Sequence, residues 1–269
     1  MSSFPQMISF SSLRSFFGSN CFHFLFESFS FTHLRLHFFH CIVLLIIAVG
    51  TRLYTSRAAW YGAGLFVTSA GYFTYAHDAR PELLYSLFCF MGLSCFVASL
   101  NKKPTGKLPL VYMMWISYGL AILTKGPQIP MMFLLATVLF ILFVQGQGVR
   151  ALTSIQPFSG ITIMCILAAS WWILLEHRLT ADQFSTSQLA GSLLVPTFDN
   201  FLNGYYFYRP LQLILPWLPL APIVAVATFY VDEERRETNI FLGLVIIVTT
   251  ILFSVGSQQR YFYMLPILP

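Results

Sequence analysis

The sequence predicts an all-α, polytopic integral membrane protein with about eight transmembrane helices. Of its 269 residues 57% are hydrophobic, only 9% are charged, and the apolar residues form long runs separated by short polar turns. An average soluble domain carries roughly 25% charged residues, and a soluble fold could not hide so much apolar surface. Helices are expected because backbone polar groups in hydrocarbon must be satisfied within their own segment.

Crossing a bilayer takes ~20 mostly apolar residues. The runs that come close to this requirement are residues 37–53, 58–76, 82–100, 108–124, 127–144, 161–175, 211–230 and 240–255. A further apolar run begins at Tyr261. The first 36 residues are rich in Phe, Ser and His and are a poor fit to a signal peptide. We therefore assign 1–36 to an irregular head and 37–269 to the membrane domain.

The basic residues divide unevenly between the two sides of the expected bundle. Side A holds Arg52, Arg57, Lys102, Lys103, Lys107, Arg150, Arg235 and Arg236, and side B holds Arg80, Lys125, Arg178, Arg209 and Arg260. Lys and Arg concentrate in cytoplasmic loops, so side A is expected to face the cytoplasm. The net charge of +5 therefore indicates the topology of a multi-pass cell-membrane protein and not a nucleic-acid partner.

Side B carries two acidic residues at the start of a predicted span. Asp78 and Glu82 are four residues apart, so they share one face if that helix begins early. Two carboxylates could bind a divalent cation such as Mg²⁺ or Mn²⁺, or one could act as a general base. The alternative is a helix started by Pro81, whose N-terminus favours negative charge through the helix dipole.

Side B also carries basic residues beside turns and aromatic residues. Lys125 precedes Gly126 and Pro127, which form a turn between two spans; it could contact a phosphate or simply extend to the membrane interface. Arg260 precedes an aromatic trio that begins at Tyr261. Its planar guanidinium could clamp a phosphate, or the segment could be an interfacial aromatic belt.

Taken together, these strings resemble the polytopic lipid-linked glycosyltransferases of the GT-C class. The similarity is to the bacterial branch that includes protein O-mannosyltransferase-like and aminoarabinose transferase-like enzymes. The matching strings are YTSRAAWYGAGLF at 54–66, ARPELL at 79–84, LTKGP at 123–127, LPW at 215–217 and SQQRYFYMLP at 257–266. The resemblance covers Val43 to Pro269 and implies a GT-C-like fold.

The resemblance implies a hexosyl or pentosyl glycosyltransferase. Such an enzyme moves a sugar from a polyprenyl-phosphate-linked donor to an extracytoplasmic lipid, glycan or protein acceptor, and membrane lipids surround it. Glu82 matches the family's acidic position, often a metal or phosphate-site ligand, and Asp78 lies beside that motif. These two are the candidate catalytic carboxylates, and Glu82 is the candidate metal ligand. Arg80, Lys125 and Arg260 are the candidate donor-phosphate ligands.

The chain departs from the family pattern in its head and before its aromatic cluster. The family's acidic residue in the first outer loop, taken as the catalytic base, has no counterpart, since the only acid in the head is Glu27. No His-x-x-Pro string precedes Tyr205 and Tyr206. We therefore expect a chain shortened at both ends that inserts into the membrane and could lack activity.

Two other classes of protein are compatible with the composition. A transporter predicts ionisable residues at mid-span and paired broken helices, whereas a non-catalytic membrane scaffold predicts no common site. A transferase requires that Glu82, Lys125 and Arg260 converge on one outward cavity.

Overall fold

The computed structural model describes residues 21–76, 82–100, 104–146, 148–178, 203–227, 233–255 and 261–267. Every regular element in these ranges is a helix, which confirms the predicted all-α fold. The elements are α2 (Cys21–Leu53), α3 (Ser56–Val67), α4 (Ala70–Ala76), α5 (Glu82–Leu100), α6 (Pro104–Lys125), α7 (Gln128–Leu139), the π-helical η1 (Phe140–Val144), the 3₁₀ helix η2 (Val149–Ile155), α8 (Pro157–Arg178), α12 (Tyr205–Tyr208), the 3₁₀ helices η3 (Arg209–Ile214) and η4 (Leu218–Leu220), α13 (Ala221–Ala227), α14 (Glu233–Val255) and the 3₁₀ helix η6 (Tyr261–Ile267).

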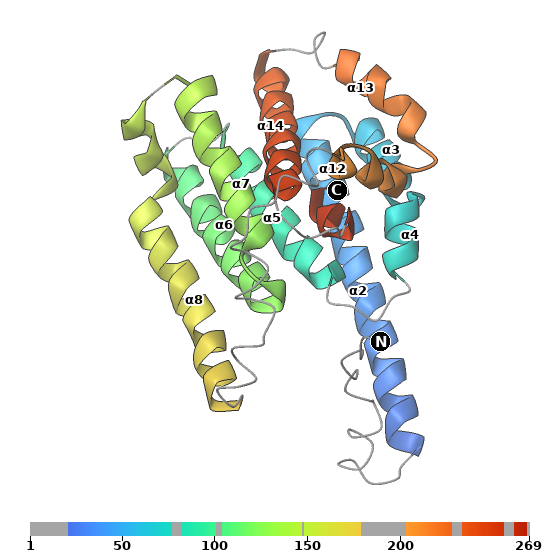
Figure 1. Ribbon diagram of the computed structural model, residues 1–269. Helices are drawn as coiled ribbons and strands as arrows, with labels where there is room; N and C mark the ends of the chain where they lie inside the picture. The colour runs from blue at the N-terminus through green and yellow to red at the C-terminus, as the bar shows by residue number, and fades with distance from the viewer. Residues whose placement is uncertain are drawn as a thin grey trace.

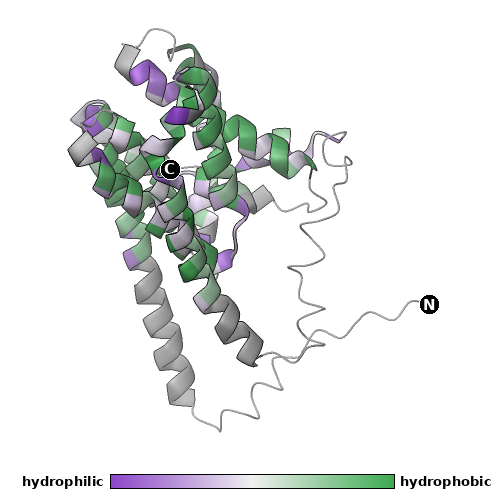
Figure 2. Cartoon of the chain, turned by 90° about the vertical axis from the view of Figure 1, so that its left-hand side faces the viewer, coloured by the Kyte–Doolittle hydropathy of each residue, from purple (hydrophilic) through white to green (hydrophobic). Residues whose placement is uncertain are grey.

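Within the described residues, three helices are long and apolar enough to cross a membrane: Glu82–Leu100, Gly106–Lys125 and Arg235–Val255. Shorter apolar helices cover His37–Leu53, Gln128–Val144 and Pro157–Ser170. These helices correspond to the predicted spans 37–53, 82–100, 108–124, 127–144, 161–175 and 240–255. In Figure 2 most of the coloured helices are largely hydrophobic, and hydrophilic residues form short stretches.

The prediction of one continuous span over 58–76 is wrong, and the span over 211–230 is broken at its prolines. Thr68 and Ser69 separate α3 from α4, and the second segment breaks into short helices around a cis Leu215–Pro216 peptide bond. The two interruptions meet, because the Ala70 N–H donates to the Leu215 carbonyl at 2.7 Å. A backbone N–H that lacks a helical partner at one break is thus hydrogen-bonded to a carbonyl at the other. Membrane proteins tolerate irregular backbone where such groups are satisfied in this way.

The predicted irregular head is partly helical. α2 begins at Cys21, so residues 21–36 continue directly into the first predicted span. This stretch contains neither Gly nor Pro, the residues that most disfavour a helix interior. Residues 1–20 lie outside the described part of the chain.

α5 lies at the centre of the bundle, with α8 at one edge and α3, α4 and α13 on the other side (Figure 1). Its core packing is close and aromatic: Phe96 contacts Phe241 of α14 at a ring-centroid distance of 4.8 Å. The ring of Tyr118 on α6 lies directly against Gly92 on α5, where an added Cβ would be only 2.4 Å from that ring. The absence of a side chain at Gly92 therefore allows α5 and α6 to approach closely.

Arg52 and Arg235, assigned to side A, lie at a different end of the bundle from Glu82, assigned to side B. Leu53 at the end of α2 and Leu242 near the middle of α14 line the same cavity as Leu93 and Val97, in the second half of α5. Arg52 and Arg235 therefore lie toward the end of the bundle where α5 finishes, which is side A. Glu82 starts α5 at the opposite end, side B.

Candidate functional site

Glu82 is the first residue of α5, and only 6% of it is exposed. Its position in the first turn is favourable for a negative charge because of the helix dipole. The Glu82 Oε1 atom accepts a hydrogen bond from Lys125 Nζ at 2.9 Å. The carboxylate is thus both a helix-terminal charge and the buried half of a partly buried ion pair.

Lys125 is the last residue of α6, where the helix dipole favours a positive charge. The side chain of Lys125 is 20% exposed, against 8% for that of Glu82, so the pair has one sheltered and one partly accessible member. The pair joins the beginning of α5 to the end of α6. An ammonium group held in this way has a defined position that a freely extending lysine would lack.

Tyr85 completes this site, and sequence analysis did not single it out. Its hydroxyl donates to the Gly126 carbonyl at 3.3 Å and accepts from the Ile129 N–H at 3.1 Å. Lys125 Nζ lies 5.9 Å from the centroid of the Tyr85 ring, within cation–π range. Tyr85 stands three residues after Glu82, so both lie on the same face of α5.

The turn between α6 and α7 depends on a glycine. Gly126 has φ +116°, a backbone conformation that side chains disfavour. Because Tyr85 binds Gly126 and Ile129 on either side of Pro127, the turn is fixed to α5. The position of Lys125 therefore follows from the turn as well as from the ion pair.

The described residues do not by themselves form a divalent-cation site. They contain no group of three or more His, Cys, Asp or Glu residues that could hold a metal ion. Glu82 Oε2 is buried without a hydrogen-bond partner among them, but its other oxygen already binds an ammonium group. A cation with one carboxylate ligand and an adjacent ammonium does not meet the six oxygen ligands that Mg²⁺ prefers. The metal stays a prediction whose second carboxylate, Asp78, lies outside the described residues.

Of the predicted site residues, the structure places Glu82 and Lys125 and brings them into contact. Asp78, Arg80 and Arg260 lie outside the described residues. The helix η6, which follows Arg260 in the chain, packs against α5 and η3.

Arg209, a further cation assigned to side B, is the first residue of η3. Its guanidinium lies 6.0 Å from the ring centroid of Tyr205 and 5.8 Å from that of Tyr208. Its Nε atom is buried and has no hydrogen-bond partner among the described residues. The string YYFYR indicates this arrangement in the sequence, since aromatic residues one helical turn apart can both reach the same arginine.

Replacing Tyr85 by Phe should lower the free energy of unfolding by about 2 kcal/mol. The change leaves the N–H of Ile129, a residue that is 1% exposed, without its partner, and unsatisfied buried donors cost about 1–3 kcal/mol. Denaturation in mixed micelles would measure the change. Tyr112→Phe is the matched control, because its hydroxyl makes only a 3.4 Å contact to Ser159. Equal losses in the two variants would contradict the role assigned to Tyr85.

The helical bundle, its apolar spans and its charged side B define a polytopic membrane protein with a GT-C-like fold. The particular likeness is to ArnT from Cupriavidus metallidurans. Its crystal structure bound to undecaprenyl phosphate matches with a TM-score of 0.71 and 16% identity, over 89% of this chain and 44% of that one. Its apo structure matches with a TM-score of 0.65 and 17% identity, over 87% and 43%.

This chain thus spans less than half the length of the ArnT chains it matches. At these identities the likeness is one of fold. No family model matches the sequence, and no curated protein does either.

Proposed function

We propose that this protein is a glycosyltransferase that moves a sugar from a polyprenyl-phosphate-linked donor to an extracytoplasmic lipid, glycan or protein acceptor. The observation that carries the proposal is the Lys125 ammonium, held at side B by buried Glu82 and by the turn bound to Tyr85. The sequence strings and the GT-C-like fold support it independently. One of the ArnT structures with this fold is bound to undecaprenyl phosphate.

Lys125 has the chemistry that such a donor needs. When the sugar is transferred, the acceptor forms a bond to the anomeric carbon as the bond from that carbon to the phosphate oxygen breaks. The bonding electrons stay with the phosphate, where negative charge develops. A cation already in position stabilises that charge without reorganisation. In this proposal Lys125 contacts the phosphate, and Glu82 positions Lys125.

The remaining predicted residues extend the proposal. Arg80 and Arg260 would supply further cations for the phosphate, and Asp78 would be the carboxylate nearest to the acceptor. Side B would face the extracytoplasmic side of the cell membrane, because side A has more basic residues.

The test is binding of an undecaprenyl-phosphate-linked sugar, and of undecaprenyl phosphate alone, to the purified full chain in detergent. Lys125→Gln should weaken binding of both by at least about tenfold, as expected for a lost hydrogen bond to a charged group. Lys125→Arg should retain much of the affinity, because it keeps the charge and the pairing with Glu82.

Lys107→Gln is the matched control, since Lys107 lies near the other end of the same helix. The Lys107→Gln variant should bind both ligands as tightly as the unmodified protein does. If Lys125→Gln and Lys107→Gln bind equally well as folded proteins, Lys125 does not contact the phosphate and the proposal fails. Sugar transfer to an acceptor, measured in the same samples, would test turnover separately from binding.

A transporter is the second candidate, and one observation favours it. The two broken segments are paired, and Trp217 Nε1 donates to Thr68 Oγ1 at 2.8 Å across the break. However, the single charged residue that is buried among the described residues is Glu82, at a helix end and not at mid-span. Solute flux into liposomes that is abolished by Trp217→Phe would favour the transporter.

A further inference from the structure

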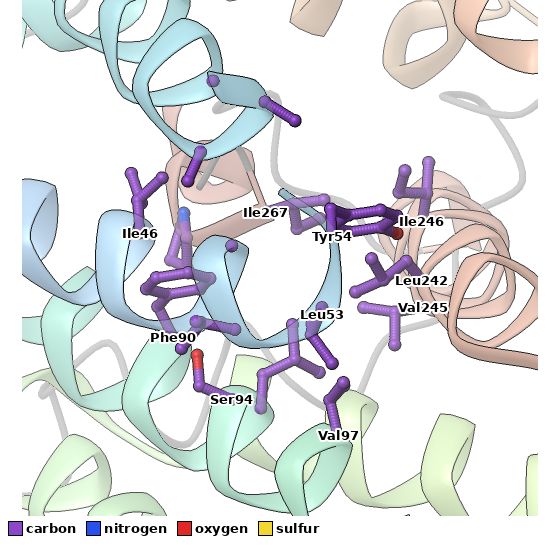
Figure 3. A pocket seen from close by; sticks show the side chains of 17 residues that line it. Ile46, Leu53, Tyr54, Phe90, Ser94, Val97, Leu242, Val245, Ile246 and Ile267 are labelled. Atoms are coloured by element: carbon purple, nitrogen blue, oxygen red, sulfur yellow. The ribbon is translucent and has the colours of Figure 1, made fainter. Parts of the chain in front are cut away.

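An apolar cavity of about 330 Å³ lies between α2, α3, α5, α14 and η6. In Figure 3, Leu53, Phe90 and Val97 gather around it, with Tyr54 beside Ile246 and Ile267. An apolar cavity of roughly half this volume is large enough to bind benzene. This cavity therefore has room for a hydrocarbon ligand.

The cavity is separate from the Glu82–Lys125 site. The α5 residues that line it run from Phe90 to Val97, whereas Glu82 begins that helix. At 1.5 Å per residue these positions are about 12–22 Å from Glu82 along the helix axis. The cavity thus lies toward side A, opposite the proposed phosphate contact.

Few polar groups face the cavity. The Tyr54 hydroxyl is already hydrogen-bonded to the Asn239 side chain. Ser94 is 5% exposed, and its hydroxyl has no hydrogen-bond partner among the described residues. A buried water normally needs two to four polar partners, so water suits this space poorly. An apolar molecule that carries one acceptor oxygen matches the lining better.

The rim and the floor of the cavity differ in exposure. Phe90, Leu93, Ser94 and Val97 on α5 are buried and form the floor. On the rim, Ala58 of α3 is exposed and Ile246 of α14 is 50% exposed. The side of the cavity formed by these two residues is therefore exposed, whereas the α5 side is closed.

Basic residues flank the rim on side A. Arg52 and Arg57 are exposed and adjoin the lining residues Leu53 and Ala58, and residues 51–57 contain no acid. Arg235 on α14 is close enough to Tyr54 to oppose the effect of burial, which raises the pKa of that hydroxyl. The sequence of α14 also contains Glu237, close to Arg235 and Arg236. The turn between α2 and α3 therefore supplies a local positive charge.

We propose that this cavity binds one acyl chain of an anionic glycerophospholipid from the leaflet at side A. The acyl chain fills the apolar space, and its ester carbonyl accepts a hydrogen bond from the Ser94 hydroxyl. The phosphate of the lipid lies beside Arg52 and Arg57. A polyprenyl chain offers no carbonyl to Ser94. A phosphate attached to it would lie at side A, away from Lys125.

Native mass spectrometry of the full chain, titrated with phosphatidylglycerol, phosphatidylcholine or undecaprenyl phosphate, tests the assignment. One phosphatidylglycerol should be retained, with a preference over phosphatidylcholine of about fivefold for each arginine. Gly62→Leu should weaken its binding by on the order of tenfold, because Gly62 lines the cavity and an added Cβ meets no atom within 4 Å. Gly64→Leu is the control: it is an equally open position on α3 outside the lining, and its binding should be unchanged.

A second pair of variants tests the Ser94 hydroxyl. Ser94→Ala should weaken retention, whereas Ser86→Ala, which removes another buried and unpartnered hydroxyl of α5 outside the lining, should not. Equal retention in Gly62→Leu and Gly64→Leu would overturn the proposal. So would a preference for undecaprenyl phosphate that Gly62→Leu removes, because the occupant would then be a polyprenyl chain.

Discussion

Replacing Lys125 by Met should lower the free energy of unfolding by roughly 3 kcal/mol, as expected when one partner of a buried ion pair is removed. Met keeps most of the length of the side chain but leaves the Glu82 carboxylate without its ammonium. Glu82 is 6% exposed, so its charge cannot reach water without rearrangement of α5. Equilibrium unfolding in mixed micelles, followed by circular dichroism, measures the loss.

The double variant Lys125→Met/Glu82→Gln separates the ion pair from other effects. It should recover most of the lost stability, because a neutral amide is far less costly to bury than an unpaired carboxylate. Both variants should bind undecaprenyl phosphate poorly, since both lack the ammonium. A double variant no more stable than Lys125→Met would show that the two side chains are not energetically coupled.

Gly160→Ala should be comparably damaging, although it adds only a methyl group. An added Cβ at this position would be 2.1 Å from the Trp115 indole. Trp115 is 3% exposed and its Nε1 donates to the Ile155 carbonyl at 2.8 Å, so the indole cannot move without breaking that bond. Overpacking costs about 1–3 kcal/mol and the lost hydrogen bond about 1 kcal/mol, which together give a loss of roughly 2–4 kcal/mol.

Gly243→Ala provides the comparison. Gly243 also lies in a helix, α14, but an added Cβ meets no atom within 4 Å. The substitution should be neutral or stabilising by up to about 1 kcal/mol, because Ala favours helix over Gly. If Gly160→Ala unfolds at the same denaturant concentration as Gly243→Ala, the close packing of α6 on α8 does not depend on Gly160.

The candidate site shows which site residues local sequence patterns can predict. The strings ARPELL and LTKGP directed attention to Glu82 and Lys125, and the structure joins these residues by a hydrogen bond of 2.9 Å. A transferase was expected to bring them to one site, but the direct ion pair was not predicted, because the two residues stand 43 residues apart on different helices. Tyr85 was overlooked for the same reason, because its partners, Gly126 and Ile129, are distant in sequence. In an apolar helix such as α5, a tyrosine by itself indicates only an aromatic packing residue.

The broken segment 58–76 likewise shows that local sequence does not predict features of the fold that depend on distant residues. Residues 58–76 have the composition of one span, and nothing local predicts the interruption at Thr68 and Ser69. The interruption is stabilised by Leu215 and Trp217, which come from a segment about 150 residues later. Conversely, the helix over residues 21–36 extends into the predicted irregular head because the absence of Gly and Pro allows α2 to continue.

Composition and the lengths of the apolar runs determined the all-α membrane class, most of the spans and the basic side A. These properties depend on each segment's own transfer from water to lipid and on its internal backbone hydrogen bonds. Tertiary structure alone decided which charges meet at side B, how the breaks in two spans are stabilised and where a cavity remains beside Ser94. Those outcomes depend on contacts between distant helices, where a hydrogen-bond partner or an unfilled space exists only once the bundle has packed.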